Sequence, residues 1–204
     1  MTPNGYGSSS GVAALFFLDV QGRQSDGTWG GGRVKKLVAK ASDSGNGMMG
    51  ATWVDIDNNG TADWVYATDL KGQLWKFDIS DASPAGWKVA YGTSAAPKAL
   101  FTAASGQAIT ARPDVTRFPQ GGYMVTVGSG RYVDVGDNGA GSAQAMYGIL
   151  DDGNEVALAD LQVQSVVRTA TASNGTVYRL STHAVGTPAD AQLAGDNVIT
   201  LASY

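Results

Sequence analysis

The chain has 204 residues, 28 of them glycine, with 14 basic and 18 acidic side chains and a formal net charge of −4. This weak negative charge, without any basic stripe, excludes a nucleic-acid-binding protein. The lack of cysteine excludes disulfides, thiolate metal sites and thiol nucleophiles. The longest apolar run, residues 12–18, is much shorter than the roughly 20 residues that span a bilayer. The glycine content and the charged fraction of 16% favour a turn-rich β protein.

Eight segments are predicted to be strands, because each is short, rich in β-branched or aromatic residues, and bounded by Gly, Asn, Asp or Ser. In chain order they are Val12–Val20, Arg33–Ala39, Ala62–Thr68, Gln73–Ile79, Tyr123–Gly128, Arg131–Val135, Ala145–Leu150 and Thr176–Leu180. Loops are predicted at Gly27–Gly32, Ser42–Gly50 and Gly136–Gly141. Residues 155–167 are the best helix candidate, but they fit an extended segment equally well, so we expect little helix.

The clearest local prediction is a hairpin in the centre of the chain. Residues 62–70 and 73–79 are predicted to pair across a two-residue turn at 71–72. Because successive side chains of a strand point to opposite faces, the second strand is expected to share three apolar side chains on one face: Trp75, Phe77 and Ile79.

Similar aromatic strand ends recur at Leu15–Val20, Leu74–Ile79 and Met146–Asp151, at unequal intervals. Antiparallel units with such a degenerate repeat are typical of propeller blades, which occupy roughly 40 to 50 residues each. We therefore predict an all-β, β-propeller-like fold of about four blades, with residues 1–204 forming a single fragment of one propeller domain. A β-sandwich remains the alternative.

One segment predicts metal chemistry: Asp55-Ile-Asp-Asn-Asn-Gly-Thr-Ala-Asp63. Its oxygen donors stand at positions 1, 3, 5, 7 and 9, as in the first half of an EF-hand loop, and glycine holds position 6, where the chain must turn sharply around the ion and a Cβ is expected to clash. With a water molecule, they supply the 6 to 8 oxygens that Ca²⁺ takes, whereas Mg²⁺ prefers a smaller octahedral shell. The predicted ligands are the side chains of Asp55, Asp57, Asn59 and Asp63 and the carbonyl of Thr61.

This loop departs from an EF-hand in two ways. Position 12 is Tyr66 instead of a bidentate glutamate, and both flanks resemble strands rather than helices. Asp63 must therefore close the site. The alternative is a tight turn rich in Asp and Asn without any ion, but five correctly spaced donors together with Gly60 favour a metal site.

Other candidates favour ordinary structural roles. His183 stands alone in a polar stretch, which is more typical of a surface residue than of a catalytic one. Asp151 and Asp152 favour a hairpin turn over an acid/base pair, and the glycines of 128–130 lie between two predicted strands, where phosphate loops are not found. Three tryptophans are expected to pack between sheets rather than form a sugar-stacking platform: Trp53, Trp64 and Trp75.

The block from Gly50 to Ser80, which holds the acidic loop and the central hairpin, closely resembles the C-terminal β-propeller domain of the PilY/PilC-type tip-associated adhesins of bacterial type IV pili. Further matching segments follow the family's order: Gly11–Val20, Ile109–Asp114, Gly121–Tyr132 and Ala145–Ile149. In that family the DxDxNGxxD segment is the calcium loop, and every ligand position is filled here. The family's later Gly-Trp strand segment is missing and the chain starts inside the domain, so we expect a truncated propeller or one completed by segments outside this chain.

The resemblance implies a calcium-binding, non-enzymatic module on the cell surface, at the pilus tip. The implied roles are pilus biogenesis, control of retraction and thus of twitching motility, and adhesion. The implied partners are minor pilins and a host or abiotic surface. Two other functions stay open, a calcium-dependent lectin-like propeller and, less favoured, a quinoprotein-like dehydrogenase.

Overall fold

The computed structural model describes residues 1–30, 32–138, 143–163, 166–171, 173–175, 177–181 and 198–201. His183 lies outside these residues. The chain divides into two compact units, residues 1–158 and residues 159–204, and each is described by itself below. The prediction that residues 1–204 form a single propeller fragment stays a prediction.

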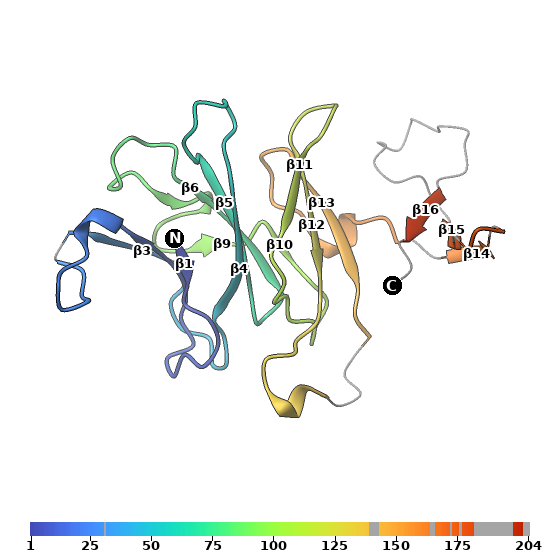
Figure 1. Cartoon of the computed structure of the whole chain (residues 1–204), viewed down its shortest axis with the longest axis horizontal. Helices are drawn as coiled ribbons and strands as arrows, with labels where there is room; N and C mark the ends of the chain where they lie inside the picture. The colour runs from blue at the N-terminus through green and yellow to red at the C-terminus, as the bar shows by residue number, and fades with distance from the viewer. Residues whose placement is uncertain are drawn as a thin grey trace. The chain divides into compact units, whose positions relative to one another are not determined.

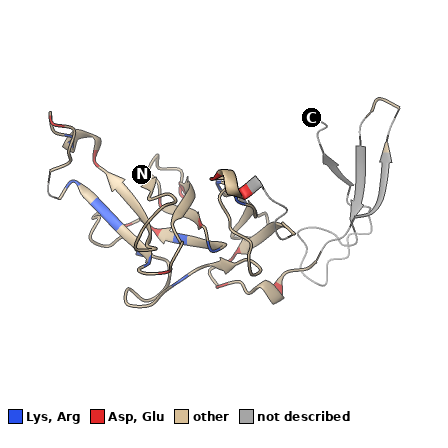
Figure 2. Ribbon diagram, turned by 90° about the horizontal axis from the view of Figure 1, so that it is seen from below, with Lys and Arg blue, Asp and Glu red and all other residues tan. Residues whose placement is uncertain are grey.

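The first unit begins with a three-stranded antiparallel sheet in the order β1-β2-β3. Its strands are β1 (Thr2–Pro3), β2 (Ala13–Leu18) and β3 (Val34–Lys40), and a short 3-10 helix, η1 (Val20–Gly22), follows β2. The lysines of β3 colour this strand in Figure 2, whereas the acidic residues lie mostly in loops and at strand ends. The predicted strands at residues 12–20 and 33–39 are thus confirmed.

A second, five-stranded sheet carries the central hairpin and has the order β10-β6-β5-β4, with β7 also paired to β6. Its strands are β4 (Met48–Val54), β5 (Trp64–Asp69), β6 (Gln73–Asp78), β7 (Lys88–Val89) and β10 (Phe101–Thr102). Beside it, β8 (Tyr91–Gly92) and β9 (Pro97–Lys98) form a two-stranded ladder. The acidic loop joins β4 to β5, at the upper edge of this sheet in Figure 1.

The third sheet of the first unit has the order β11-β12-β13 and lies beside β4 in Figure 1. Its strands are β11 (Asp114–Arg117), β12 (Tyr123–Gly128) and β13 (Met146–Asp151), and the 3-10 helices η2 (Val135–Asn138) and η3 (Leu158–Asp160) flank β13 in the sequence. The second unit holds another antiparallel sheet, made of β14 (Val166–Thr171), β15 (Val177–Ser181) and β16 (Val198–Leu201).

The hydrophobic core lies between the first and second sheets. Alanine and leucine side chains of β2 and β3 pack there against the apolar face of the hairpin, which presents Trp75, Phe77 and Ile79 as predicted. Edge-on contact of Phe17 with Trp87, at 4.9 Å between ring centroids, extends this core. Burial of these apolar side chains is the main force that holds the two sheets together.

At β4 the second sheet meets residues 111–113 through backbone and small side chains, whereas larger side chains, such as Phe101 and Tyr147 at 4.9 Å between ring centroids, pack between the second and third sheets elsewhere. A Cβ added to Gly50 of β4 would stand 2.5 Å from the carbonyl oxygen of Ala111, so only glycine allows this contact. The hydroxyl of Thr52 donates to the carbonyl of Pro113 over 2.6 Å, and that of Thr68 donates to Ala111 over 3.1 Å. This close approach brings the face of β4–β6 against β11–β13.

Several local predictions are wrong for identifiable reasons. Residues 131–135 do not form a strand, because the Asp137 carboxylate accepts from the backbone N–H groups of Val133 and Asp134 and curls the chain into η2. The loop predicted at residues 42–50 ends earlier, since β4 begins at residue 48. The hairpin turn has three residues rather than two, 70–72, with Gly72 at φ 76°. Nine strands of the described residues were not predicted: β4, β11, β14, β16 and the two-residue strands β1, β7, β8, β9 and β10.

Candidate metal centre

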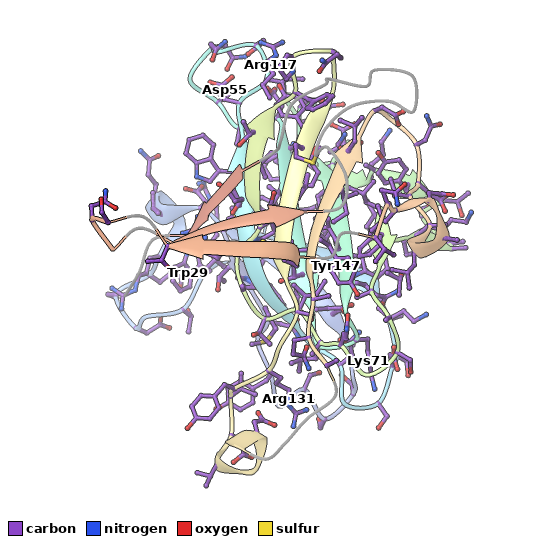
Figure 3. The ribbon with its side chains drawn as sticks, turned by 90° about the vertical axis from the view of Figure 1, so that its right-hand side faces the viewer. Trp29, Asp55, Lys71, Arg117, Arg131 and Tyr147 are labelled. Carbon is purple, nitrogen blue, oxygen red and sulfur yellow. The ribbon has the colours of Figure 1, made fainter. Side chains whose placement is uncertain are left out.

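The acidic loop is a tight connection at one end of the hairpin formed by β4 and β5. Val54 and Trp64 are paired across the two strands, and the backbone N–H of Asp63 donates to the Val54 carbonyl over 2.9 Å. Figure 3 shows Asp55 at the same end of the first unit as Arg117, while Lys71 and Arg131 lie at the opposite end. The strands therefore hold both ends of the loop, and the residues between them project from the sheet.

Three of the five predicted ligands come together in this loop. Each of Asp55, Asp57 and Asp63 offers a carboxylate oxygen, and these oxygens lie within 4.8 Å of one another. Two ligands on opposite sides of a Ca²⁺ ion stand about 5 Å apart, since each Ca–O bond is about 2.3 to 2.6 Å long. The separations between the three carboxylates lie within that span, and the all-oxygen donor set is that of a hard cation.

Asp63 is the buried anchor of the group, with 6% of its surface exposed. Its Oδ2 accepts from the Ile56 N–H over 2.8 Å, which draws the start of the loop toward its end. Its own carbonyl accepts from the Ile79 N–H over 2.8 Å, so it is also tied to β6. The carboxylate that was predicted to close the site is thus the one most firmly attached to the sheet.

Asp55 is held in its charged form by the loop backbone. Its Oδ2 accepts from the Gly60 N–H over 2.8 Å and its Oδ1 from the Asn59 N–H over 3.2 Å. Partial burial alone would raise the pKa of Asp55, but these backbone donors, with that of Asn58, outweigh it and lower the pKa below the ordinary value. The loop therefore presents an ionised carboxylate at neutral pH.

The other two predicted ligands brace the loop. The Asn59 amide donates through Nδ2 to Asp57 Oδ2 over 2.9 Å, and its Oδ1 accepts from the Thr61 N–H over 2.8 Å. The amide oxygen of Asn59 thus faces Thr61 beside the three carboxylates of the cluster. Ligation by Asn59 and by the Thr61 carbonyl stays a prediction.

The structure agrees with the sharp turn predicted at position 6 but not with the predicted clash. Gly60 has φ 89°, and a Cβ built on it meets nothing within 4 Å, so backbone conformation rather than a clash requires glycine. Asn58, at φ 59°, is the other residue of the loop in the left-handed region, which asparagine tolerates better than most side chains.

The predictions for the tryptophans and for the Asp151–Asp152 pair are only partly confirmed. Trp53 is 59% exposed, so the prediction that it packs between sheets is wrong, whereas Trp75 is buried in the core. Residues 152–154 form an exposed bend rather than the predicted hairpin turn, because the described strand that pairs with β13 is β12, which precedes it. Asp151 is no turn residue, because it ends β13, is 2% exposed and pairs with Lys76 of β6 over 2.7 Å. No pattern in the sequence signals this long-range ion pair.

No helix in the described residues is long and apolar enough to cross a membrane.

Comparisons with known proteins agree with this architecture. Residues 1–179 match the family model described as the PilY1 beta-propeller domain. The type IV pilus biogenesis factor PilY1 homolog of Xylella fastidiosa is 33% identical over 168 residues, which covers 75% of this chain and 11% of that protein. The type IV pilus biogenesis factor PilY1 of Pseudomonas aeruginosa PAO1 is 32% identical over 171 residues, which covers 74% of this chain and 14% of that protein.

A solved structure extends the likeness to three dimensions. The crystal structure of the Pseudomonas aeruginosa PilY1 C-terminal domain matches with a TM-score of 0.71 and 28% identity, over 89% of this chain and 42% of that one. The all-β prediction is confirmed, and the propeller rather than the sandwich is the fold. The chain spans only 11% and 14% of the two curated relatives. Sequence and structure together show that the chain belongs to the PilY1 beta-propeller family.

Proposed function

We propose that this propeller segment binds one Ca²⁺ ion in the loop 55–63 and serves, as a non-enzymatic module, in type IV pilus biogenesis. The observation that carries the proposal is the convergence of three carboxylates within 4.8 Å. Membership of a family whose named relatives are pilus biogenesis factors supports the pilus role. The proposed ligands are the side chains of Asp55, Asp57, Asn59 and Asp63 and the carbonyl of Thr61.

Charge explains why ion binding would order the loop. Three ionised carboxylates placed this close repel one another, and a bound dication lowers their combined charge from −3 to −1. Backbone N–H groups that point at Asp55 already offset part of that repulsion. Because the ion binds the folded loop and not the unfolded chain, its binding free energy adds to the stability of the fold.

In the pilus, we propose that the ordered loop is a calcium-sensitive surface on the cell exterior, at the pilus tip. Minor pilins and a host or abiotic surface are the proposed partners. Control of retraction, twitching motility and adhesion are the proposed outcomes in the cell. In the full-length protein, a loop variant that cannot bind Ca²⁺ is expected to change piliation or twitching without lowering the amount of protein, and unchanged motility would contradict this role.

The binding test is calorimetric titration of chelator-treated protein with Ca²⁺ and with Mg²⁺, with thermal unfolding in parallel. Wild type should show one Ca²⁺-selective site, and Ca²⁺ at 100 times its Kd should add about 2.7 kcal/mol of stability. For a chain of this size that raises Tm by about 5 to 10 °C. No heat of binding at millimolar Ca²⁺ would overturn the proposal.

Two variants locate the site. Asp63→Ala removes the anchor and should abolish binding, but it also leaves the Ile56 N–H without its acceptor. Asp57→Asn removes one charge from an exposed side chain and should weaken Ca²⁺ binding with little effect on the stability of the chelator-treated protein. Asp81→Asn, in an exposed turn where Asp81 accepts from Ser83 N–H over 2.8 Å, is the matched control. If Asp57→Asn and Asp63→Ala both bound Ca²⁺ with the affinity of wild type, the ion would have to bind elsewhere.

The lectin-like function remains a second candidate because Trp53 is 59% exposed and stands two residues before Asp55. An exposed indole beside a bound cation is the arrangement with which a sugar ring can stack. Calcium-dependent quenching of tryptophan fluorescence by sugars would support the lectin-like function. If no quenching occurred, the pilus function would be the remaining candidate.

A further inference from the structure

A buried lysine lies at the boundary between the second and third sheets. Lys76 of β6 is 6% exposed, and its Nζ stands 3.4 Å from the centroid of the Trp64 ring. The rings of Tyr66 and Tyr91 complete an aromatic cage, at 5.8 Å and 5.9 Å from the same ammonium group. A desolvated ammonium over an indole face is a favourable cation–π contact. Lys76 therefore fixes the position of Trp64.

The counter-ion of this lysine comes from the neighbouring sheet. Asp151, at the end of β13, accepts from Lys76 Nζ over 2.7 Å. Asp151 also accepts from the Tyr91 hydroxyl over 2.5 Å and from the Tyr66 hydroxyl. Its carboxylate thus takes all three of these donors from β5, β6 and β8. This network joins the two sheets by charge-assisted hydrogen bonds in a place shielded from water.

A second contact ends at the same point of the third sheet. The Trp64 ring packs edge-on against Tyr123 of β12, with 5.2 Å between the centroids. Tyr123 and Asp151 are directly paired across β12 and β13. Trp64 and Lys76 of the second sheet therefore contact the two members of one cross-strand pair of the third sheet, Tyr123 and Asp151 respectively.

The acidic loop ends where this network begins. Trp64 directly follows Asp63 in the sequence, and the Asp63 backbone bonds to both neighbouring strands, at Val54 and Ile79. A movement of Asp63 toward a bound ion would therefore pass to Trp64, with no mobile residue between them. Because Trp64 lies against both Lys76 and Tyr123, its position affects the contact between the sheets.

We propose that Lys76, held between the Trp64 ring and the Asp151 carboxylate, is a positioning residue that couples ion binding in the loop 55–63 to the β11–β13 sheet. This inference rests on the proposed function, because it takes Ca²⁺ as the ion. It adds that β12 and β13, which contribute no ligand, respond to the ion. Energetic coupling is reciprocal, so loosening the Lys76 network must also weaken Ca²⁺ binding.

The test combines Ca²⁺ titration with hydrogen exchange of the whole chain. Lys76→Met removes the charge and keeps an unbranched side chain, but it leaves the Asp151 carboxylate buried without its cation. The double variant Lys76→Met with Asp151→Asn removes both charges and keeps the fold testable. Lys98→Met is the matched control, since Lys98 pairs with Glu155 on the exposed surface over 3.0 Å.

In wild type, Ca²⁺ should slow exchange in the β4–β5 hairpin and also at residues 146–151. In the double variant, protection should remain at the hairpin and disappear from 146–151, and the Kd for Ca²⁺ should rise about fivefold or more. A residue that only stabilises the fold would lower Tm but leave Ca²⁺-induced protection of 146–151 intact, and that result would overturn the inference. So would Ca²⁺ binding to wild type without any protection of 146–151. Absence of Ca²⁺ binding in wild type would overturn the proposed function together with the inference.

Discussion

Asp69 provides the sharpest test of how this fold uses buried carboxylates. It ends β5, its side chain is fully buried, and no basic residue in the described part of the chain forms an ion pair with it. Its Oδ1 accepts from the backbone N–H groups of Lys71 and Gln73, over 3.0 Å and 2.9 Å. Its Oδ2 accepts from the side chains of Trp75 and Asn46, over 2.9 Å and 3.1 Å. Four donors therefore converge on one carboxylate, which closes the 70–72 loop and positions Trp75 in the core.

The substitution Asp69→Asn keeps the shape but removes half of the acceptors. Whichever way the new amide is turned, its NH₂ group faces two donors, so two hydrogen bonds to a charged group are lost, at about 1.5 to 3 kcal/mol each. A gain in stability partly offsets this loss. Burial raises the pKa of Asp69 because it disfavours the charged carboxylate, and a neutral amide avoids that desolvation cost. We expect a net loss of about 3 kcal/mol of unfolding free energy.

A rearrangement of Asn46 cannot restore the balance. Turning its amide would present an acceptor to the new NH₂ group, but the Asn46 Oδ1 already accepts from the Gly47 N–H over 2.8 Å. That N–H would then lose its partner in a buried site, at about 1 to 3 kcal/mol. The expected loss is thus robust to local repacking.

Chemical denaturation followed by tryptophan fluorescence measures this loss. All five tryptophans lie within residues 1–158, so the signal reports the first unit alone. Asp152→Asn is the control, because Asp152 is exposed and accepts from Asn154 N–H in a turn over 3.1 Å; it should change stability by less than about 0.5 kcal/mol. A loss below about 1 kcal/mol in Asp69→Asn would refute the reasoning, since it would mean that the four hydrogen bonds merely offset the desolvation of the charge.

Two further predictions concern the contact between the second and third sheets. Gly50→Ala places a methyl group 2.5 Å from the Ala111 carbonyl oxygen and should lower the unfolding free energy by about 1 to 3 kcal/mol in the same denaturation assay. The control Gly128→Ala has open space around the new methyl group and should leave stability nearly unchanged. Equal effects of the two variants would show that the sheets can separate freely. Burial alone would raise the pKa of Asp151, but donation by Lys76 and two tyrosines lowers it, so its stabilising contribution is present above about pH 4 and is lost as the pH falls through the lowered pKa. The difference in unfolding free energy between wild type and Asp151→Asn should be constant from about pH 7 to 5 and shrink below about pH 4, and a difference independent of pH would contradict this assignment.

Strands with strong local signals were predictable, and those that depend on distant partners were not. β5 and β6 are short segments rich in β-branched and aromatic residues on either side of a glycine turn, so both strands follow from the composition, and the two-residue period of a strand places Trp75 and Phe77 on one face. β4 contains Gly50 and little β-branched residue content at its start. It becomes a strand because it pairs with β5 and because Gly50 permits close contact with Ala111. Residues 131–135 show the reverse case, in which Asp137 satisfies local backbone donors and overrides a strand-like composition.

The candidate metal site also has features that could be predicted from the sequence and features that could not. Spacing within nine residues was enough to predict that Asp55, Asp57 and Asp63 converge, since a hairpin loop must bring its two ends together. Spacing could not predict that Asn59 would use its amide to brace the loop, because that choice depends on hydrogen-bond geometry. Nor could it predict the Lys76 network, whose Tyr66–Asp151 bond joins residues 85 positions apart.

Three aspartates illustrate why composition alone is a poor guide to function in this chain. Asp63, Asp69 and Asp151 are all at or beside strand ends, where aspartate is ordinarily a turn former. All three are buried, but their partners differ. Asp69 accepts four neutral donors and has a raised pKa, and Asp151 accepts a lysine and two tyrosines and has a lowered one.

Asp63 alone of the three lies within 4.8 Å of two further carboxylates. A buried carboxylate needs compensation. At Asp69 and Asp151 hydrogen-bond donors of the chain converge on the carboxylate, whereas at Asp63 the hydrogen bond from Ile56 N–H leaves the adjacent negative charges of Asp55 and Asp57 unbalanced. An external cation would compensate this third environment, and this difference in partners is the physical basis of the proposal that an ion binds at Asp63.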